Sequence, residues 1–390
     1  MVVPYDAAMR KVLAVALALL AGCASEATTT APPPTVLRTF ADLASLEVPI
    51  GGHQRPLGQS GLTYERRGAA DFDDTATPAF DAVAANIRAY LACDTNDWSV
   101  AGQAVAVGIV EVGVHRRSRP LVTQGMAALD WGVRNTTLGS DGVFSLQRAC
   151  DRRSVASEGG THASTQWLAA LGEAVTVLRA SPYADELEAQ LTGFVTSMEQ
   201  LAGLLVDDAN WQTWQSTWLV DESGNVFTHK TYLMAAGLGL TASVSHDPRA
   251  PTWARRAELI AQRGMAQQWR SGVDPERGGY DVLYQSYGTW QAELYYATLP
   301  AGPLRADLGV TIDRAIAWMS SRVDQHGRVE IGASSRVCNR RDGSPPFEAA
   351  DTVRAFLTWG MVRADRSLLE WAVLIDHGSH LGNPCPSQTR

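Results

Sequence analysis

Residues 221–227 read Asp-Glu-Ser-Gly-Asn-Val-Phe, a turn of Asp and Gly that leads through apolar residues into the next segment. Related stretches stand at residues 140–144, 274–280 and 324–329, and the glycines of the four turns are spaced by 82, 55 and 48 residues. A repeat of about 50 residues is typical of stacked helical hairpins, each of which buries its apolar face against its neighbour. The pattern therefore predicts a series of hairpins, one of which lacks the turn.

Apolar residues recur at helical spacing between these turns. In residues 80–91, for example, Phe80, Ile87 and Leu91 fall on one face, which predicts an amphipathic helix. The same pattern predicts helices over residues 104–115, 121–134, 164–179, 184–206, 230–244, 252–270, 284–297, 304–322 and 346–376. No extended stretch alternates apolar and polar residues, so we expect no sizeable sheet.

The hairpins and turns together predict an all-α fold, and within that class an (α/α) toroid, which is an incomplete barrel of helical hairpins. Residues 37–390 are long for one ordinary domain, but a closed ring of hairpins takes that length as a single domain. The alternative is an irregular helical domain whose helices end in ordinary glycine caps. In a toroid, the turns that lead into the inner helices line one mouth of the central cleft.

The first residues of the chain have the order of charge and hydrophobicity that is typical of an export signal. Arg10 and Lys11 are basic, residues 12–21 form an apolar run, and the sequence Leu-Ala-Gly-Cys ends at Cys23. The run is shorter than the roughly 20 apolar residues that a permanent transmembrane helix needs. The last four residues resemble the lipobox of bacterial lipoproteins, which implies a signal peptide over residues 1–23 and a lipid anchor at Cys23.

Residues 24–36 are rich in Ala, Thr and Pro, and we expect them to form a flexible tether. Ala24 stands at the position where an Asp commonly retains lipoproteins at the inner membrane. The resemblance therefore implies an outer-membrane rather than an inner-membrane anchor. The protein is expected in the bacterial cell envelope, attached to the membrane through Cys23 and facing the periplasm or the exterior.

Cysteine usage fits an oxidising compartment. Apart from Cys23 the chain has four cysteines, an even number, and four cysteines allow three pairings. We favour Cys93 with Cys150 and Cys338 with Cys385, because each of these pairs falls within one half of the chain.

Charge and missing motifs exclude several function classes. The formal net charge of −8 argues against nucleic acid as a partner. The sequence has no phosphate-binding loop, no Gly-x-Ser-x-Gly elbow and no His-Glu-x-x-His motif. It has neither Cys-x-x-Cys nor a metal-type spacing of Cys and His, so we expect no cofactor and no metal site. The protein is expected to be a monomer.

Polar and aromatic residues gather at the turns that lead into the predicted inner helices. Asn225 and His229 are four residues apart and share a face if the helix has begun at Asn225. About 50 residues later Arg277 precedes three tyrosines at helical spacing, Tyr280, Tyr284 and Tyr287.

Two further groups of residues stand at similar places. His162 opens another predicted helix, and Arg336 and Arg340 belong to a basic loop after the last turn. Guanidinium groups suit the carboxylates of acidic sugars, because they form two parallel hydrogen bonds with a carboxylate.

At these residues the chain resembles the (α/α)-toroid polysaccharide lyases of the alginate lyase and chondroitin or hyaluronate lyase types. In those enzymes an Asn, a His, a Tyr and an Arg surround a uronate, and in the alginate lyase type the Arg precedes the Tyr by one loop. Arg277 precedes Tyr284 in this way, but Thr228 rather than Asn comes directly before His229. The resemblance implies the catalytic residues Asn225, His229, Arg277 and Tyr284, and the substrate-binding residues His162, Tyr280, Tyr287, Arg336 and Arg340.

The implied reaction is β-elimination from an anionic, uronic-acid-containing polysaccharide. The proton at C5 of the sugar becomes acidic enough only when the neighbouring carboxylate is neutralised, which Asn225 with Arg277 or protonated His162 would do. A neutral His229 suits the role of base, since the ordinary pKa of histidine is near 6.5. Tyr284 would donate a proton to the departing O4, although for some stereochemistries it could act as both acid and base.

Two other functions fit the same chain. A glycoside hydrolase on the same fold needs two carboxylates across the cleft, and Asp281 with Glu158 or Asp351 are the candidates. A noncatalytic, glycan-binding envelope lipoprotein is the other alternative, because fold alone does not fix function.

Each candidate residue also has a structural interpretation. A histidine near a helix start often caps the helix, and tyrosines at helical spacing often pack in a wall of helices. Trp211, Trp214 and Trp218 are at helical spacing and are expected in the core. The lyase hypothesis requires that the predicted base, acid and arginine converge on one cleft.

Overall fold

The structure is a computed structural model of the whole chain. It describes residues 47–50, 53–56, 101–115, 117–135, 137–140, 144–147, 154–156, 161–221, 223–276, 278–331, 334, 350–363 and 365–379. All of them belong to the compact unit Thr35–Arg390. Outside the described residues lie Cys23, the tether at residues 24–36, the helix predicted over residues 80–91, and the four other cysteines with both predicted pairings.

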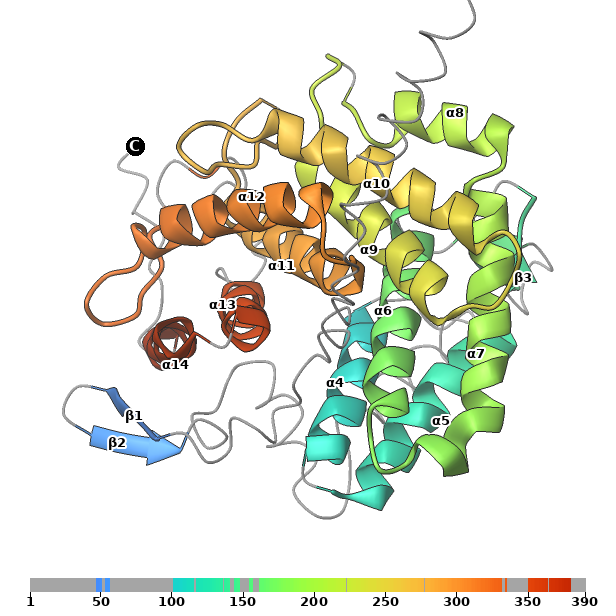
Figure 1. Cartoon of the computed structure of the whole chain (residues 1–390), viewed down its shortest axis with the longest axis horizontal. Helices are drawn as coiled ribbons and strands as arrows, with labels where there is room; N and C mark the ends of the chain where they lie inside the picture. The colour runs from blue at the N-terminus through green and yellow to red at the C-terminus, as the bar shows by residue number, and fades with distance from the viewer. Residues whose placement is uncertain are drawn as a thin grey trace, which may run out of the picture. The chain divides into compact units, whose positions relative to one another are not determined.

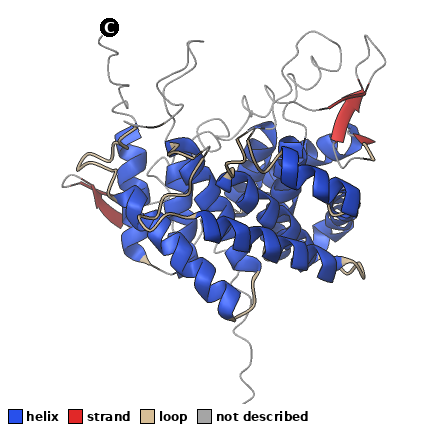
Figure 2. Ribbon diagram, turned by 90° about the horizontal axis from the view of Figure 1, so that it is seen from above, coloured by secondary structure: helices blue, strands red, loops and turns tan. Residues whose placement is uncertain are grey.

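The described residues are predominantly helical, which confirms the all-α prediction (Figure 2). The helices are α4 (Ala101–His115), α5 (Arg119–Asn135), α6 (Thr161–Arg179), α7 (Ala184–Leu205), α8 (Asp208–Thr217), α9 (Thr228–Val244), α10 (Ala250–Gln267), α11 (Val282–Thr298), α12 (Pro303–Ser320), α13 (Ala350–Arg363) and α14 (Arg366–Ser379). Among them, none is both long and apolar enough to cross a lipid bilayer.

Strands are short wherever the structure describes them, and they form two small antiparallel sheets. The first sheet pairs β1 (Glu47–Ile50) with β2 (His53–Pro56). The second has the order β3 (Thr137–Leu138), β4 (Phe144–Gln147), β5 (Ser154–Ala156). The turn predicted at residues 140–144 joins β3 to β4, and its central residues 141–143 lie outside the described part.

The observed helices differ from the predicted ones at two places in the chain. The helix predicted over residues 346–376 is two helices, α13 and α14, because the Asp365 carboxylate accepts the N–H of Ser367 at 2.9 Å and caps a new helix start. The helix α8 was not predicted, but its tryptophans were expected in the core. That expectation is confirmed, since Trp211 and Trp214 are 5 % exposed and Trp218, which follows α8, is 8 % exposed.

The helices pack as consecutive pairs, α4 with α5, α6 with α7, α9 with α10, α11 with α12 and α13 with α14 (Figure 1). We call the first members of these pairs the first set and the second members the second set. Helices of the first set pack against one another in chain order, α4 with α6, α6 with α9, α9 with α11 and α11 with α13. In the second set, α5 contacts α7, and α10 contacts α12.

Burial differs between the two sets, as α9 and α10 illustrate. Every residue from Thr231 to Thr241 of α9 is buried, because α6, α7, α10 and α11 all pack against this helix. In α10 the buried residues fall on one face, Trp253, Ala257, Ile260, Ala261 and Gly264. A helix that is apolar on every side belongs inside a protein, whereas one with a single apolar stripe belongs at its surface.

The predicted turns at residues 221–227 and 324–329 have the same structure. In each, the Asp carboxylate accepts backbone N–H groups two and four residues later, at 2.9 Å and 2.9 Å for Asp221 and at 2.8 Å and 3.0 Å for Asp324. The glycine has a positive φ, +79° at Gly224 and +78° at Gly327. This left-handed conformation is one that glycine adopts without the steric cost of a Cβ.

The turn at residues 274–280 is different. Glu276 and Gly279 pair across it through two backbone hydrogen bonds, at 2.8 and 3.0 Å, and Gly278 has a φ of +75°. The backbone at Glu276 also pairs with Phe227, the residue before α9. This second pairing ties the start of α9 to the segment that leads into α11.

A buried ion cluster joins three helices of the first set. Nη2 of Arg354 in α13 lies 2.6 Å from Oε1 of Glu173 in α6 and 3.4 Å from both carboxylate oxygens of Glu111 in α4. The guanidinium also lies 3.9 Å from the ring centroid of Trp290 in α11. Burial raises the pKa of Glu111 well above its usual range, although Arg354 opposes the shift. The cluster therefore links α13 to α4, which is far from it in the sequence.

Candidate functional site

Four of the predicted site residues come together at the N-terminal ends of α6, α9 and α11. The rings of His229 and Tyr284 are stacked, with centroids 4.1 Å apart and an interplanar angle of 30°. His162 meets His229 edge-on at 5.6 Å, and Tyr287 meets it at 6.2 Å. Residues that are 67, 55 and 3 positions apart in the sequence thus form one aromatic cluster.

Two features of α11 set this geometry. The Asp281 carboxylate accepts the N–H groups of Leu283 and Tyr284, at 3.1 and 3.2 Å, and so fixes the first turn that carries Tyr284. Gly288 faces α9, where a Cβ would lie 3.0 Å from the Cα of His229. The absence of a side chain at Gly288 allows α11 to approach α9 closely enough for the rings to stack.

Glu276 is the main residue that sequence reasoning missed. Its Oε1 accepts the backbone N–H of His229 at 2.8 Å and lies 2.8 Å from Nδ1 of the same residue. His229 is 2 % exposed and Glu276 is 1 % exposed. The available signal was an acidic residue in the turn before α11, but nothing in the sequence shows that this turn contacts the start of α9.

His162 is a neutral ring at neutral pH, whereas its protonated form was one of the two cations considered for the substrate carboxylate. Burial lowers the pKa of His162 to about 3, with smaller contributions from the nearby His229 and Lys230. Its Nδ1 is buried and has no hydrogen-bond partner among the residues that the structure describes. The Nζ of Lys230 donates to the Trp218 carbonyl at 3.0 Å and lies 3.8 Å from the ring centroid of Phe227.

Tyr287 is held by α6. Its hydroxyl accepts a hydrogen bond from Nε2 of Gln166 at 3.0 Å, and its ring contacts Trp290 with centroids 5.7 Å apart. Burial raises the pKa of Tyr287 well above its usual range. The Tyr287 side chain therefore stays un-ionised and acts as a hydrogen-bonding group.

Asn225 lies in the turn before α9 rather than on the helix. Helix α9 begins at Thr228, and Phe227 before it has an extended backbone, with φ −92° and ψ 96°. Asn225 and His229 therefore do not share a helix face. The Asn225 amide donates to Asp221 at 3.1 Å, and its side chain lies beside Gly278.

Tyr280 lies away from this cluster. Its ring packs on Trp318, with centroids 4.4 Å apart, and the guanidinium of Arg322 lies 5.6 Å from its centroid. Burial raises the pKa of Tyr280 well above its usual range. Three other predicted site residues lie outside the described part of the chain, namely Arg277, Arg336 and Arg340.

Comparisons with protein-family models, with curated proteins and with solved structures give no match for this chain. A function is therefore inferred from the geometry of the site, above all from the stacked rings of His229 and Tyr284. Across the described residues, no group of three or more His, Cys, Asp and Glu side chains is placed to hold a metal ion.

The carboxylates considered for a hydrolase do not form a described pair. The Asp281 carboxylate is fully buried and caps α11. Asp351 is half-buried in the first turn of α13, and Glu158 lies outside the described residues.

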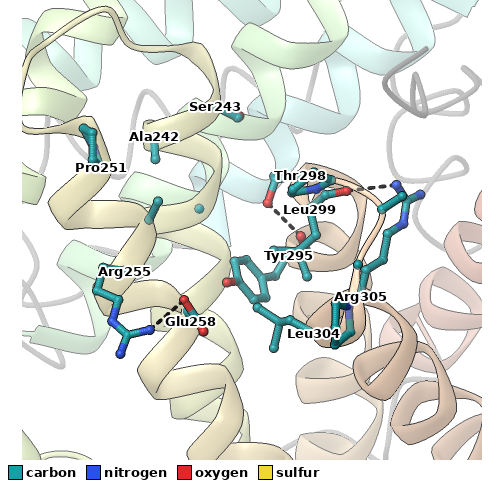
Figure 3. A pocket seen from close by; sticks show the side chains of 16 residues that line it. Ala242, Ser243, Pro251, Arg255, Glu258, Tyr295, Thr298, Leu299, Leu304 and Arg305 are labelled. Carbon is teal, nitrogen blue, oxygen red and sulfur yellow. Dashed lines mark hydrogen bonds and ion pairs between the residues drawn. The ribbon is translucent and has the colours of Figure 1, made fainter. Parts of the chain in front are cut away.

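A separate cavity of about 670 Å³ lies between the C-terminal ends of α9 and α11 and the N-terminal ends of α10 and α12 (Figure 3). Its charged side chains contact protein groups: Arg255 pairs with Glu258 at 3.0 Å, and Arg305 donates to the Leu299 carbonyl at 2.9 Å. None of the predicted site residues lines it.

Acidification from pH 6.5 toward pH 3 is expected to lower the free energy of unfolding through His162. Because its folded pKa of about 3 lies below the ordinary 6.5, the unfolded chain takes up a proton in this range and the folded chain does not. One group contributes at most about 1.4 kcal/mol per pH unit. Urea denaturation at several pH values measures the free energy of unfolding of the wild type and of His162→Gln. On acidification, the stability of His162→Gln should fall less than that of the wild type.

The matched control is His246→Gln, which replaces an exposed histidine outside the cluster. Its stability should follow the wild-type pH dependence. An equal pH dependence in wild type and His162→Gln would mean that the folded protein protonates His162 as readily as the unfolded chain does.

Proposed function

We propose that this protein is a polysaccharide lyase that cleaves uronic-acid-containing polysaccharide by β-elimination, with His229 as the base and Tyr284 as the acid. The observation that supports the proposal is the stacking of the two rings at 4.1 Å, at the N-terminal ends of neighbouring helices. In β-elimination the proton is taken from C5 and the leaving oxygen is bound to C4. Because these carbons are adjacent, the base and the acid must lie within a few ångströms of each other.

The two proton transfers involve only these two side chains and the substrate. His229 takes the C5 proton, and the electron pair of the C–H bond forms the C4–C5 double bond. The C4–O4 bond breaks, and Tyr284 donates its hydroxyl proton to O4. The products are a new non-reducing end with an unsaturated uronate and a second chain with a free hydroxyl. His162 and Tyr287 would hydrogen-bond the sugar as neutral groups, and Asn225 and Arg277 would neutralise its carboxylate.

We also propose that residues 37–390 form one (α/α) toroid. The alternation of a buried first set with a one-sided second set supports this arrangement, because toroids place one helix of each hairpin inside and the other outside. The contact of Arg354 with Glu111 supports closure, since it brings α13 to α4. The catalytic cluster would then lie at one mouth of the ring.

The same proposal includes export as a lipoprotein. The charged residues, apolar run and lipobox-like sequence that ends at Cys23 support a lipid anchor. The protein would act as a monomer in the cell envelope, with the outer membrane favoured, on polysaccharide that reaches the periplasm or the cell surface.

Ultraviolet absorbance tests the proposed function directly. The purified protein is incubated with alginate, glucuronan, hyaluronan, chondroitin and heparan, and absorbance of the unsaturated uronate is expected to rise with at least one of them. His229→Ala and Tyr284→Phe should each lower the initial rate by at least about 100-fold. Tyr296→Phe, at the far end of the same helix, is the matched control and should keep the wild-type rate.

The low exposure of His229, 2 %, favours a second candidate, a noncatalytic glycan-binding lipoprotein. Glycan binding with no absorbance change on any member of the panel would support that candidate and contradict the lyase proposal. New reducing ends without absorbance would also contradict it and would indicate a hydrolase.

A further inference from the structure

Helix α11 carries a glutamate in its most enclosed part. Every residue from Gly288 to Tyr295 is buried, so no side of the helix faces solvent in this stretch. Glu293 is the one carboxyl group among these residues, and it is 0 % exposed. A glutamate on a surface helix reaches water with its carboxyl group, whereas the carboxyl of Glu293 is enclosed by protein.

Neither oxygen of this carboxyl group is hydrogen-bonded. Both Oε1 and Oε2 of Glu293 are buried, and no donor among the residues that the structure describes reaches them. An ionised carboxylate that has lost its water and has no donor is far more costly to bury than the neutral acid. Burial therefore raises the pKa of Glu293 well above its usual range.

The ionisable groups around α11 do not offset this burial. Those of α11 itself and of α9, α12 and α13, which pack against it, are Tyr284, Tyr287, Tyr295 and Tyr296, then His229, Lys230 and Tyr232, then Arg305, Asp307, Asp313 and Arg314, and then Asp351, Arg354 and Arg363. The buried cation of α13, Arg354, lies 2.6 Å from Glu173. Arg305 of α12 donates to the Leu299 carbonyl at 2.9 Å. Among the described residues, Glu293 thus has no cation as a partner.

We infer that Glu293 is a proton-dependent switch in the packing of α11. The helix keeps its contacts with α9, α12 and α13 while the Glu293 carboxyl carries a proton, and loss of that proton opens them. A carboxylate formed in the enclosed stretch needs water or a cation, and these reach it only when the helices separate. The inference concerns the fold and does not rest on the proposed function.

Rising pH is expected to destabilise the folded protein through Glu293. In the unfolded chain this side chain is in water and ionises near the ordinary pKa of 4.5, whereas in the folded chain it keeps its proton to much higher pH. Above pH 4.5 unfolding therefore releases this proton, and the contribution of Glu293 to stability falls as the pH rises. Acidification toward pH 4.5 removes the penalty.

Urea denaturation of wild type and Glu293→Gln at pH 5 and pH 7 tests the inference. Glutamine keeps the size of the side chain but does not ionise. One proton released on unfolding changes the unfolding constant by about tenfold per pH unit. The ratio of the wild-type unfolding constant to that of the variant should therefore rise by roughly 50- to 100-fold between the two pH values. Groups that titrate in both proteins, such as His162, cancel in this ratio.

Glu258→Gln is the matched control on a neighbouring helix. The Glu258 side chain is 32 % exposed and pairs with Arg255 at 3.0 Å. Because water reaches this carboxylate, the corresponding ratio should change by less than about threefold between pH 5 and pH 7. Glu293→Leu also lacks an ionisable group at position 293, and its ratio should rise as that of Glu293→Gln does.

Infrared spectroscopy reads the protonation state directly in folded protein. The spectrum of wild type minus that of Glu293→Gln at pH 7 should contain the carbonyl band of a protonated carboxyl group. The band of an ionised carboxylate in its place overturns the inference, as does an unfolding ratio that stays constant between pH 5 and pH 7.

Hydrogen exchange tests whether ionisation opens the helix. Compared at the same pH, the amides of α11 should exchange faster in wild type than in Glu293→Gln, and this difference should grow as the pH rises. Equal exchange in the two proteins across the pH range would overturn the proposed opening of α11. An absence of lyase activity has no bearing on any of these results.

Discussion

Replacing Gly327 with alanine is expected to lower the free energy of unfolding by about 2 to 5 kcal/mol, or to prevent folding. The backbone at Gly327 has a φ of +78°, where an L side chain costs roughly 1 to 2 kcal/mol. A Cβ would also collide with the backbone carbonyl of Leu374 in α14. Because a backbone atom cannot move aside alone, the turn or the helix must shift, and such overpacking costs about 1 to 3 kcal/mol.

Gly224→Ala is the matched control, because its turn has the same hydrogen bonds and a φ of +79°. A Cβ at Gly224 would meet no atom within 4 Å. Only the backbone conformation is penalised there, so we expect a loss of about 1 to 2 kcal/mol. Urea denaturation of both variants separates the conformational cost from the packing cost. Equal losses of stability in the two variants would show that α14 does not pack against the turn at residues 324–329.

Replacing Arg354 with methionine is expected to cost about 3 to 5 kcal/mol. Arg354 is 5 % exposed as a residue. Its guanidinium lies against Glu173, Glu111 and the ring of Trp290. Methionine keeps much of the apolar volume but leaves a buried carboxylate without its cation, a change that typically has this cost. Thermal or urea denaturation measures the loss.

Arg363→Met is the control on the same helix. Arg363 also pairs with a carboxylate, at 3.4 Å from Asp313, and lies over a tryptophan, 5.3 Å from the centroid of Trp359. Its side chain is 45 % exposed, so we expect a loss below about 1 kcal/mol. Adding Glu173→Gln to Arg354→Met should recover part of the stability, because it removes the unpaired charge. Additive losses in the double variant would contradict a shared cluster.

Much of the helical fold could be predicted, because burial on one face leaves a periodic pattern. The helix predicted over residues 184–206 is observed as Ala184–Leu205, and that predicted over 252–270 as Ala250–Gln267. The break between α13 and α14 was missed, since Asp365 interrupts a pattern that continues on both sides. The link from Arg354 to Glu111 spans 243 residues and has no local signal.

The candidate site could be predicted only in part. The position of His229 near a helix start and the spacing of Tyr284 and Tyr287 identified residues that the structure brings together. Helical spacing also placed Tyr280 with them, but Tyr280 precedes α11 and packs on Trp318 instead. Glu276 could not be recognised, because its role depends on the pairing of its turn with Phe227 rather than on its neighbours in the sequence.

The complete burial of residues 231–241 bears on the order in which the chain folds. Helix α9 is covered by α6 and α7, which precede it, and by α10 and α11, which follow it. During synthesis its apolar sides therefore stay partly uncovered until the chain has been made as far as Thr298, the end of α11. An intermediate that ends after α9 exposes apolar surface that favours aggregation. Assembly of this region is thus a late, cooperative event, and a fragment cut between α9 and α10 has no complete core.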